Sequence, residues 1–161
     1  MKTDLELMND KDLRVRREVA KRIGVEHLPK MMNDKNYYIR SEVARRIGNV
    51  GGTFAIEHLP KMMNDESWDV RHEVAERIDP IHLPMMMNDE DNWVREEVAK
   101  RIGIEHLPKM MNDKDSDIRL EIVRRIGSKG GAFAREHLPK MMNDKYSQVR
   151  HEVAERMKKL K

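Results

Sequence analysis

Two kinds of charge pair recur along the chain at fixed spacing, and they are the first candidates for chemistry. An aspartate precedes an arginine by six residues in six places. A carboxylate beside a base could serve acid–base catalysis, but a pair repeated six times is poor evidence for one unique catalytic site. We therefore interpret the pairs as a structural ladder, in which guanidinium groups tie the turns of adjacent segments together. The ladder residues are Asp10, Arg16, Asp34, Arg40, Asp65, Arg71, Asp89, Arg95, Asp113, Arg119, Asp144 and Arg150.

A glutamate also stands four residues before an arginine in each of the six places. On a helix this order of charges is favourable by about 0.2–0.5 kcal/mol per pair, so we predict surface ion pairs here rather than ligands. The pairs are Glu18 and Arg22, Glu42 and Arg46, Glu73 and Arg77, Glu97 and Arg101, Glu121 and Arg125, and Glu152 and Arg156.

Histidine and glycine motifs that could bind metal or phosphate are incomplete. The string RHEVAER, with His72 and Glu76, lacks the second histidine of the helical zinc motif. GNVGGT and GSKGGA lack the GK[ST] ending of a phosphate loop. Five further histidines recur once per segment, which is too far apart for one metal ion, so we expect them to pack beside methionines. They are His27, His58, His82, His106 and His137. We predict no enzyme activity, no catalytic residue, no metal and no cofactor.

These residues recur because the chain is built from a 24-residue segment that is repeated six times. The copies are residues 1–24, 25–48, 56–79, 80–103, 104–127 and 135–158, and inserts at 49–55 and 128–134 produce a longer period of 79 residues. A short segment cannot bury its apolar side alone, so repetition at this period predicts a solenoid. We expect a single repeat domain over residues 1–161.

Each copy has the pattern of a short helical hairpin. Leu59, Met62 and Met63 fall on one face of a first helix, and Val70 and Val74 belong to the apolar stripe of a second. We expect the inserts to lengthen two of the first helices. The proline near the first helix should open it in the 24-residue copies and bend it in the insert-bearing copies. The prolines are Pro29, Pro60, Pro84, Pro108 and Pro139.

The second helix has predicted start and stop signals. Its N-cap position holds Asp12, Asn36, Ser67, Asp91 and Asp115, whereas Tyr146 departs from the rule. Glycine, which tolerates a left-handed conformation, should end the helix in four copies, and Asp79-Pro80 replaces that stop once. The four glycines are Gly24, Gly48, Gly103 and Gly127.

The string HLPKMMND followed by VR, EVA and RIG resembles the HEAT-repeat pattern over nearly the whole chain. The 24-residue spacing is also similar to that of the leucine-rich-repeat variant family, although these copies are shorter than a usual HEAT hairpin and contain no cysteine. The resemblance implies an all-α, right-handed α-solenoid with an Asp–Arg ladder and a binding role.

The composition narrows the class of protein. Charged residues make up 38% of the chain but the net charge is only +3, so both signs must be interleaved on surfaces. The absence of cysteine excludes disulfides and thiolate zinc sites and fits a cytoplasmic location. No apolar run approaches the roughly 20 residues needed to cross a bilayer, and we expect no membrane partner.

Positions that vary among the copies while staying exposed are the expected binding surface. In a HEAT-like solenoid the second helices line the concave face, and we call its two variable rows the second-helix face. They comprise Arg17, Ser41, His72, Glu96, Leu120 and His151, and Lys21, Arg45, Glu76, Lys100, Arg124 and Glu155. A second candidate is the turn edge, formed by Tyr37, Tyr38, Trp68 and Trp93, with Tyr146 at the same edge. Such aromatics often anchor interfaces but can equally pack over helix ends.

Charge distribution favours a protein or peptide partner. The first two copies carry +2 each, the third −4, the fourth −2 and the fifth 0, while residues 128–161 carry +5. Nucleic acid prefers a continuous basic track, which the acidic centre interrupts. We therefore expect a scaffold that binds a protein or peptide; the alternative is nucleic-acid binding by the basic terminal copies.

Overall fold

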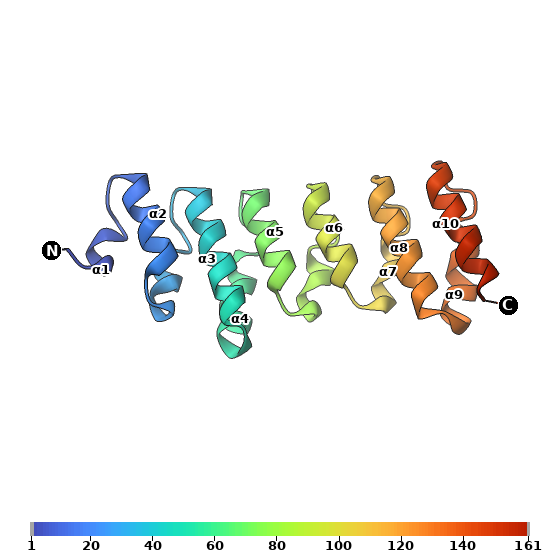
Figure 1. Ribbon diagram of the computed structural model, residues 1–161, viewed down its shortest axis with the longest axis horizontal. Coiled ribbons are helices and arrows are strands. Elements are labelled where there is room, and N and C mark those ends of the chain that lie inside the picture. Colours follow the sequence, from blue (N-terminus) through green and yellow to red (C-terminus); the bar gives the residue numbers. More distant parts are fainter. Residues whose placement is uncertain (1, 161) are drawn as a thin grey trace. The chain divides into compact units, whose positions relative to one another are not determined.

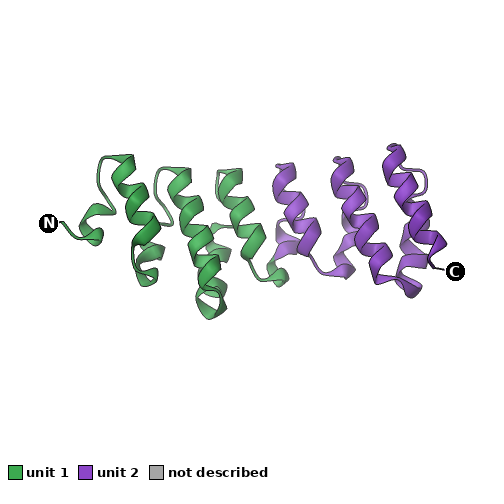
Figure 2. Ribbon diagram, viewed as in Figure 1, with its two compact units in different colours: residues 1–82 green, residues 83–161 purple. Residues whose placement is uncertain are grey.

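A computed structural model describes residues 2–160, which are helical apart from their turns and contain no β-strand. The all-α prediction is confirmed. The chain divides into two compact units, residues 1–82 and 83–161 (Figure 2). The division falls inside the fourth copy of the repeat.

Unit 1 contains three helical hairpins, of which the first is abbreviated (Figure 1). Its elements are α1 (Asp4–Leu7), α2 (Leu13–Arg22), η1 (Val25–Met31), α3 (Tyr37–Val50), α4 (Gly52–His58), η2 (Leu59–Met62) and α5 (Trp68–Arg77), where η denotes a 3₁₀ helix. The 3₁₀ segment η3 (Pro80–Met85) leads out of this unit into the next.

Unit 2 repeats the arrangement with three more hairpins, the first of which begins in η3. Its remaining elements are α6 (Asn92–Arg101), η4 (Ile104–His106), α7 (Leu107–Met110), α8 (Ser116–Lys129), α9 (Gly131–His137), η5 (Leu138–Met141) and α10 (Ser147–Lys158).

Within each unit the second helices pack side by side. Helix α3 contacts both α2 and α5 in unit 1, and α8 contacts both α6 and α10 in unit 2. The core beneath them consists of aliphatic side chains, and a leucine is fully buried at the same position of five copies: Leu28, Leu59, Leu83, Leu107 and Leu138. Stacked hairpins that share a continuous core are the α-solenoid architecture predicted from the repeat.

Four of the five predicted side-chain N-caps are confirmed. The side chains of Asp12, Asn36, Asp91 and Asp115 each accept a backbone N–H from the first turn of a second helix. Ser67 and Tyr146 occupy the same position without a side-chain cap.

The first helices are mostly 3₁₀ helices, and the prediction for their prolines is only partly correct. Pro29 and Pro84 lie inside η1 and η3 and do not open them, whereas Pro108 lies in the first turn of α7 as predicted. In the insert-bearing copies α4 and α9 lengthen the first helix, as expected, and the helix type changes from α to 3₁₀ at Pro60 and Pro139. Proline has no N–H for an α-helical bond to the preceding turn, which favours this change.

The predicted glycine stops are only partly correct: Gly24 and Gly103 follow the ends of α2 and α6 without being left-handed, and Gly48 and Gly127 do not end their helices. Gly24 has φ −55°, and Gly48 lies inside α3. The left-handed glycines are instead in the inserts, where Gly51 (φ 69°, ψ −164°) and Gly130 (φ 66°, ψ −161°) end α3 and α8. Each insert therefore lengthens the preceding second helix as well as the following first helix.

Candidate functional site

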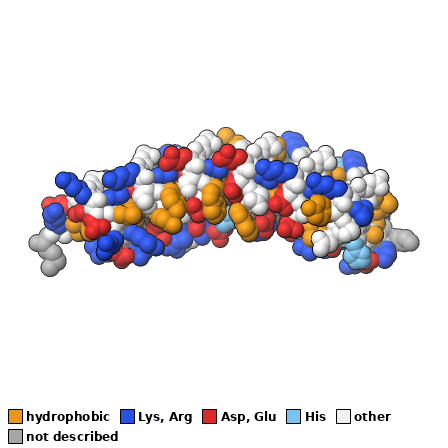
Figure 3. Space-filling model, turned by 90° about the horizontal axis from the view of Figure 1, so that it is seen from above, with side chains coloured by type: hydrophobic (Ala, Val, Ile, Leu, Met, Phe, Trp, Pro, Cys, Tyr) orange, Lys and Arg blue, Asp and Glu red, His pale blue; other side chains and the backbone are white. Residues whose placement is uncertain are grey.

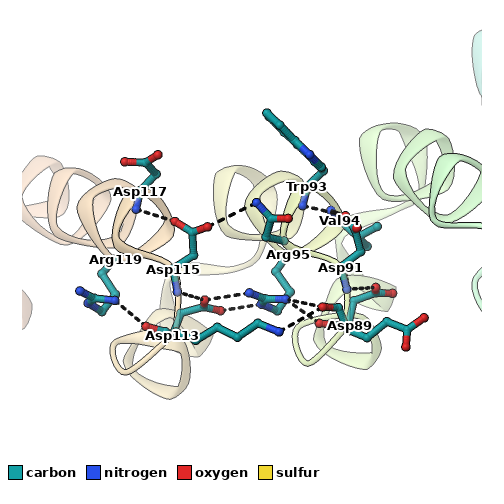
Figure 4. Close-up of polar contacts among 12 residues, drawn as sticks. Asp89, Asp91, Trp93, Val94, Arg95, Asp113, Asp115, Asp117 and Arg119 are labelled. Carbon is teal, nitrogen blue, oxygen red and sulfur yellow. Dashed lines mark hydrogen bonds and ion pairs between the residues drawn. The ribbon is translucent and has the colours of Figure 1, made fainter.

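The ladder arginines bridge successive turns. Arg40 donates through Nε and Nη2 to the carboxylate of Asp65 at 2.7 and 2.8 Å, and through Nη1 to the carbonyl of Asp34 at 2.8 Å. The carboxylate thus belongs to the next copy, while the aspartate six residues earlier contributes its backbone. Arg16, Arg95 and Arg119 repeat this pattern, with carboxylates from Asp34, Asp113 and Asp144. Figure 4 shows Arg95 between the two turns of unit 2.

The inner ladder carboxylates are already engaged by several hydrogen-bond donors. Asp113 accepts two bonds from Arg95 and a third from the backbone N–H of Asp115 at 2.8 Å. The equivalent hydrogen bond from Arg119 is the main reason that the pKa of Asp144 lies below its ordinary value. A carboxylate that is buried, ionised and saturated with donors is a poor base, so these contacts support a structural role.

The predicted Glu–Arg pairs form only in part. Arg77 pairs with Glu73 at 2.5 Å and Arg156 with Glu152 at 2.7 Å. Burial raises the pKa of Glu73, and Arg77 opposes that shift.

Three arginines of the predicted Glu–Arg pairs contact other groups instead of their glutamates. Arg22 pairs with Asp4 at 2.7 Å. Arg46 donates instead to the carbonyl of Ala20 at 2.7 Å. Arg125 donates likewise to the carbonyl of Ala99.

Two of the recurring histidines, His58 and His137, are buried against phenylalanine rings. The rings of Phe54 and His58 lie 4.5 Å apart, and those of Phe133 and His137 lie 4.4 Å apart. Residues 2–160 contain no group of three or more His, Cys, Asp or Glu side chains placed to hold a metal ion. Within the same residues the Nδ1 of His106 is the one buried side-chain polar atom that lacks a hydrogen-bond partner.

The second-helix face contains an open groove in unit 2. Leu120 and Arg124 of α8 and His151 of α10 line this groove of about 520 Å³, together with Asp117, Ser147, Gln148 and Glu152. Three residues predicted to bind a partner therefore come together here. Leu120 gives the groove an apolar side chain among charged and polar ones.

The second-helix face also borders a smaller groove in unit 1. Lys21 of α2 and Arg45 of α3 line a groove of about 330 Å³, together with Val25, Arg46, Asn49 and Val50. Arg45 is paired with Glu42 at 2.6 Å, and this hydrogen bond raises the pKa of Arg45. One of the predicted cations is thus partly neutralised by its own helix.

The remaining predicted residues of this face are spread along the second helices. Lys100 pairs with Glu96 at 2.9 Å on α6, and Glu76 with Arg77 at 2.6 Å on α5. Glu155 pairs with Lys158 at 2.6 Å on α10. Arg17 is exposed, and Ser41 and His72 are half-buried. They line neither of these two grooves.

The aromatic side chains of the turn edge are largely exposed. Tyr38, Trp68 and Trp93 all present more than a third of their surface to solvent. Trp93 points away from the ladder (Figure 4). The rings of Tyr37 and Tyr38 lie 4.1 Å apart, and their hydrogen bond raises the pKa of Tyr37 to about 12. The guanidinium of Arg17 lies 6.0 Å from the centre of the Tyr38 ring, which places the turn edge beside the second-helix face in unit 1.

Two exposed apolar residues were missed by the sequence analysis. Ile81 is 76% exposed and Met85 is 72% exposed. Alignment of the copies contained the signal, because four other copies have glutamate where Ile81 stands and lysine where Met85 stands.

The surface is mixed in charge, and its helices are not of membrane type. Figure 3 shows Lys and Arg intermingled with Asp and Glu on the face that it displays. None of the helices formed by residues 2–160 has both the length and the apolar character needed to cross a bilayer.

Several solved helical-repeat proteins resemble this chain in three dimensions. A leucine-rich repeat variant described as a novel repetitive structural motif is 33% identical, with a TM-score of 0.80, and the match covers 93% of this chain and 58% of that one. This chain therefore spans less than two thirds of the length of that protein. No protein-family model and no curated protein sequence matches the chain.

Two more distant structures support the fold alone. A chain in a condensin subcomplex from S. pombe is 18% identical with a TM-score of 0.68, and the match covers 96% of this chain and 24% of that one. A designed armadillo repeat protein is 11% identical with a TM-score of 0.53, with 98% of each chain covered. The predicted resemblance to HEAT-like helical repeats is confirmed.

Proposed function

We propose that this chain is a non-catalytic scaffold that binds a protein or peptide segment on its second-helix face. The groove between α8 and α10 carries the proposal, because it brings together Leu120, Arg124 and His151, residues that differ from their counterparts in most other copies. The fold supports it, since stacked helical repeats provide extended binding surfaces. The saturated ladder supports the absence of catalysis.

The groove suggests the character of the bound segment. Leu120 offers an apolar contact, and Arg124 and His151 place positive or hydrogen-bonding groups beside it. A segment with an apolar side chain next to an acidic one would satisfy both, since apolar burial gives affinity and charge complementarity gives specificity.

Affinity capture from cell extract with the intact chain tests the proposal. We expect Leu120→Glu to deplete the specifically captured protein at least about tenfold, because a charge replaces the apolar contact in the groove. Ile56→Glu on α4 is the matched control, since Ile56 is an exposed aliphatic residue that lies outside the groove. Capture that survives Leu120→Glu but not Ile56→Glu would place the binding surface elsewhere.

The basic groove in unit 1 favours nucleic-acid binding as a second candidate. Lys21, Arg45 and Arg46 all line it, although Arg45 is paired with Glu42 and Arg46 donates to a backbone carbonyl. Fluorescence anisotropy with labelled single- and double-stranded oligonucleotides distinguishes the two candidates. Binding at about 50 mM salt that falls steeply as salt rises would support nucleic acid, and no binding at that salt would eliminate it.

A further inference from the structure

One asparagine is present in all six copies although the fold makes no use of its side chain. It stands directly before the ladder aspartate, at the turn between the two helices of each hairpin. All six of these residues are exposed, and none of their side-chain amides has a hydrogen-bond partner among residues 2–160. None has a positive φ, the other conformational reason for an asparagine in a turn. They are Asn9, Asn33, Asn64, Asn88, Asn112 and Asn143.

The exposure of these asparagines is a property of the repeat. Asn33 and Asn112 belong to the middle hairpins of their units, whose second helices α3 and α8 each pack on a neighbour at both sides. Both residues are nevertheless exposed. Packing of the array therefore leaves the donor and acceptor groups of the amide free. A residue that is identical in every copy without a structural contact is a candidate for binding.

Adjacent turns form a groove in each unit, and the asparagines line it in pairs. In unit 1, Asn9 and Asn33 line a groove of about 300 Å³, and in unit 2, Asn112 and Asn143 line one of about 330 Å³. We call these two sites the turn grooves. The lysine two positions after each of these asparagines lines the same groove. These lysines are Lys11 and Lys35 in unit 1 and Lys114 and Lys145 in unit 2.

The four lysines of the turn grooves are available to an anion. All four are exposed, and none forms an ion pair with Asp or Glu among residues 2–160. Lys114 donates to the carbonyl of Glu90 at 3.2 Å, and the Nζ of Lys145 lies 5.9 Å from the centre of the Tyr146 ring. Neither contact neutralises the charge of the lysine.

The net charge of each turn groove is small and positive. The ladder carboxylates that line the grooves are already bound, Asp34 by Arg16 and Asp144 by Arg119. In unit 1 three cations and two carboxylates line the groove, which leaves a net charge of +1. In unit 2 four cations and two carboxylates leave +2.

Free amides beside a few cations suit an acidic peptide better than a nucleic acid. One asparagine amide can donate to and accept from a peptide group, and an extended peptide has its backbone groups available. Nucleic acid gains much of its affinity from a continuous run of cations. That run is interrupted in each unit, because Glu66 and Glu90 stand where the other four copies have lysine.

The distance between neighbouring turns limits how such a peptide could lie. Packed helices are about 8–10 Å apart, and an extended chain covers about that distance in three residues. Asparagines of neighbouring turns would therefore meet every third residue of the peptide.

We propose that the turn grooves bind an extended acidic peptide. The asparagine amides bind its backbone, and the lysines bind carboxylates at every third residue. This surface is separate from the second-helix face, since no residue of that face lines a turn groove. Either proposal can therefore fail without the other.

Two-dimensional ¹H–¹⁵N NMR of the full chain tests the proposal, because it resolves the side-chain NH₂ group of each asparagine. The probe is a peptide of four Glu-Ser-Ala repeats. We expect the NH₂ signals of the four turn-groove asparagines to shift during titration, while that of Asn49, which is outside both grooves, stays in place. The same peptide with glutamine for glutamate should bind at least about fivefold more weakly, because it lacks the carboxylates.

Substitutions in unit 2 separate the two kinds of contact. Asn112→Ala should weaken binding there about threefold, the effect of one lost hydrogen bond. Lys145→Glu should weaken it at least about fivefold, since it places like charges together. Lys109→Glu is the matched control, because this exposed lysine of α7 is outside the groove. Leu120→Glu should also leave the shifts unchanged, which distinguishes the turn grooves from the second-helix face.

Stability measurements test the premise that the asparagine has no structural role. Asn112→Ala should leave the urea concentration at the unfolding midpoint unchanged, and a clear decrease would overturn the proposal. So would the absence of NH₂ shifts up to about 5 mM peptide, or equal binding of the glutamine peptide. Shifts of the same signals with a single-stranded oligonucleotide, but not with the peptide, would assign the turn grooves to nucleic acid instead.

Discussion

At the scale of single residues, the most informative observation is that one guanidinium serves two turns. Arg40 binds the backbone of its own turn and the carboxylate of the next, and it is almost completely buried while doing so. A buried charge is tolerated only when it is paired and fully hydrogen-bonded. The ladder therefore fixes how neighbouring hairpins meet within each unit.

Substitution of Asp65 tests that role. Asp65→Ala should lower the free energy of unfolding by about 1–3 kcal/mol, because it leaves buried donors of Arg40 unsatisfied. Glu66→Ala is the matched control: Glu66 also contacts Arg40, at 3.0 Å, but its side chain is 84% exposed. An exposed pair contributes about 0–1 kcal/mol. Equal losses in urea denaturation would contradict the structural ladder.

The ladder also predicts a loss of stability in acid. The hydrogen bond from Arg119 holds the pKa of Asp144 below its ordinary value of 3.8. A carboxyl group whose pKa is lower in the folded state contributes stability above pH 3.8, and that contribution disappears as the pH falls through its folded-state pKa. The urea concentration at the unfolding midpoint should therefore decrease as the pH is lowered below 3.8. Asp144→Asn should be less stable at neutral pH and show a shallower acid dependence; an unchanged slope would refute the assignment.

At the scale of helices, the inserts change the lengths of the helices on either side of them. Where α2 ends at Arg22, the carbonyl of Ala20 is free to accept Arg46 of the next helix. Where the insert extends α3 to Val50, the backbone hydrogen bonds of the helix continue past the position at which α2 ends. Arg77 then pairs with Glu73 and approaches Asn49. Helix length thus explains why only some of the Glu–Arg pairs form.

The glycines that end the lengthened helices should tolerate substitution poorly. Gly51 has φ 69° and ψ −164°, a region that side-chain-bearing residues essentially do not occupy. Gly51→Ala should lower the free energy of unfolding by about 1–3 kcal/mol. Gly24→Ala is the control, because φ is −55° there and the added Cβ would meet only the flexible carboxylate of Glu26. Comparable losses in thermal denaturation would rule out this explanation.

At the scale of the whole molecule, we expect the free energy of unfolding to come from single repeats and from the contacts between neighbouring repeats. Within each unit a hairpin packs on the adjacent hairpins, and a repeat array of this kind behaves approximately as a sum of repeat and interface contributions. Such an array can keep a constant core while its exposed residues change, which is the arrangement that a binding scaffold requires.

A cavity in one repeat should therefore act locally. Leu107 is fully buried, and Leu107→Ala should cost about 2–5 kcal/mol. Hydrogen exchange should accelerate most in residues 80–127 and 135–158 and least in residues 25–48. The matched variant Leu28→Ala should reverse that order. Uniform acceleration along the chain in both variants would show a single cooperative unit instead.

The sequence by itself determined the repeat, the all-α solenoid class, four side-chain N-caps and the residues of the ladder. These properties follow from local periodicity and from residue types that recur at one spacing, so they need no knowledge of neighbouring segments. Comparison of the copies also shows that Ile81 and Met85 stand where four other copies have charged residues. Only the structure shows that both side chains are exposed.

Only the tertiary structure decided which partner each charged group takes. It paired Arg16 with Asp34 of the next copy, moved Arg46 from Glu42 to a carbonyl, and placed the left-handed glycines at Gly51 and Gly130. It also opened the groove at Leu120. The physical reason is that these outcomes depend on distances between segments 18 or more residues apart and on where a helix ends, which a local pattern does not encode.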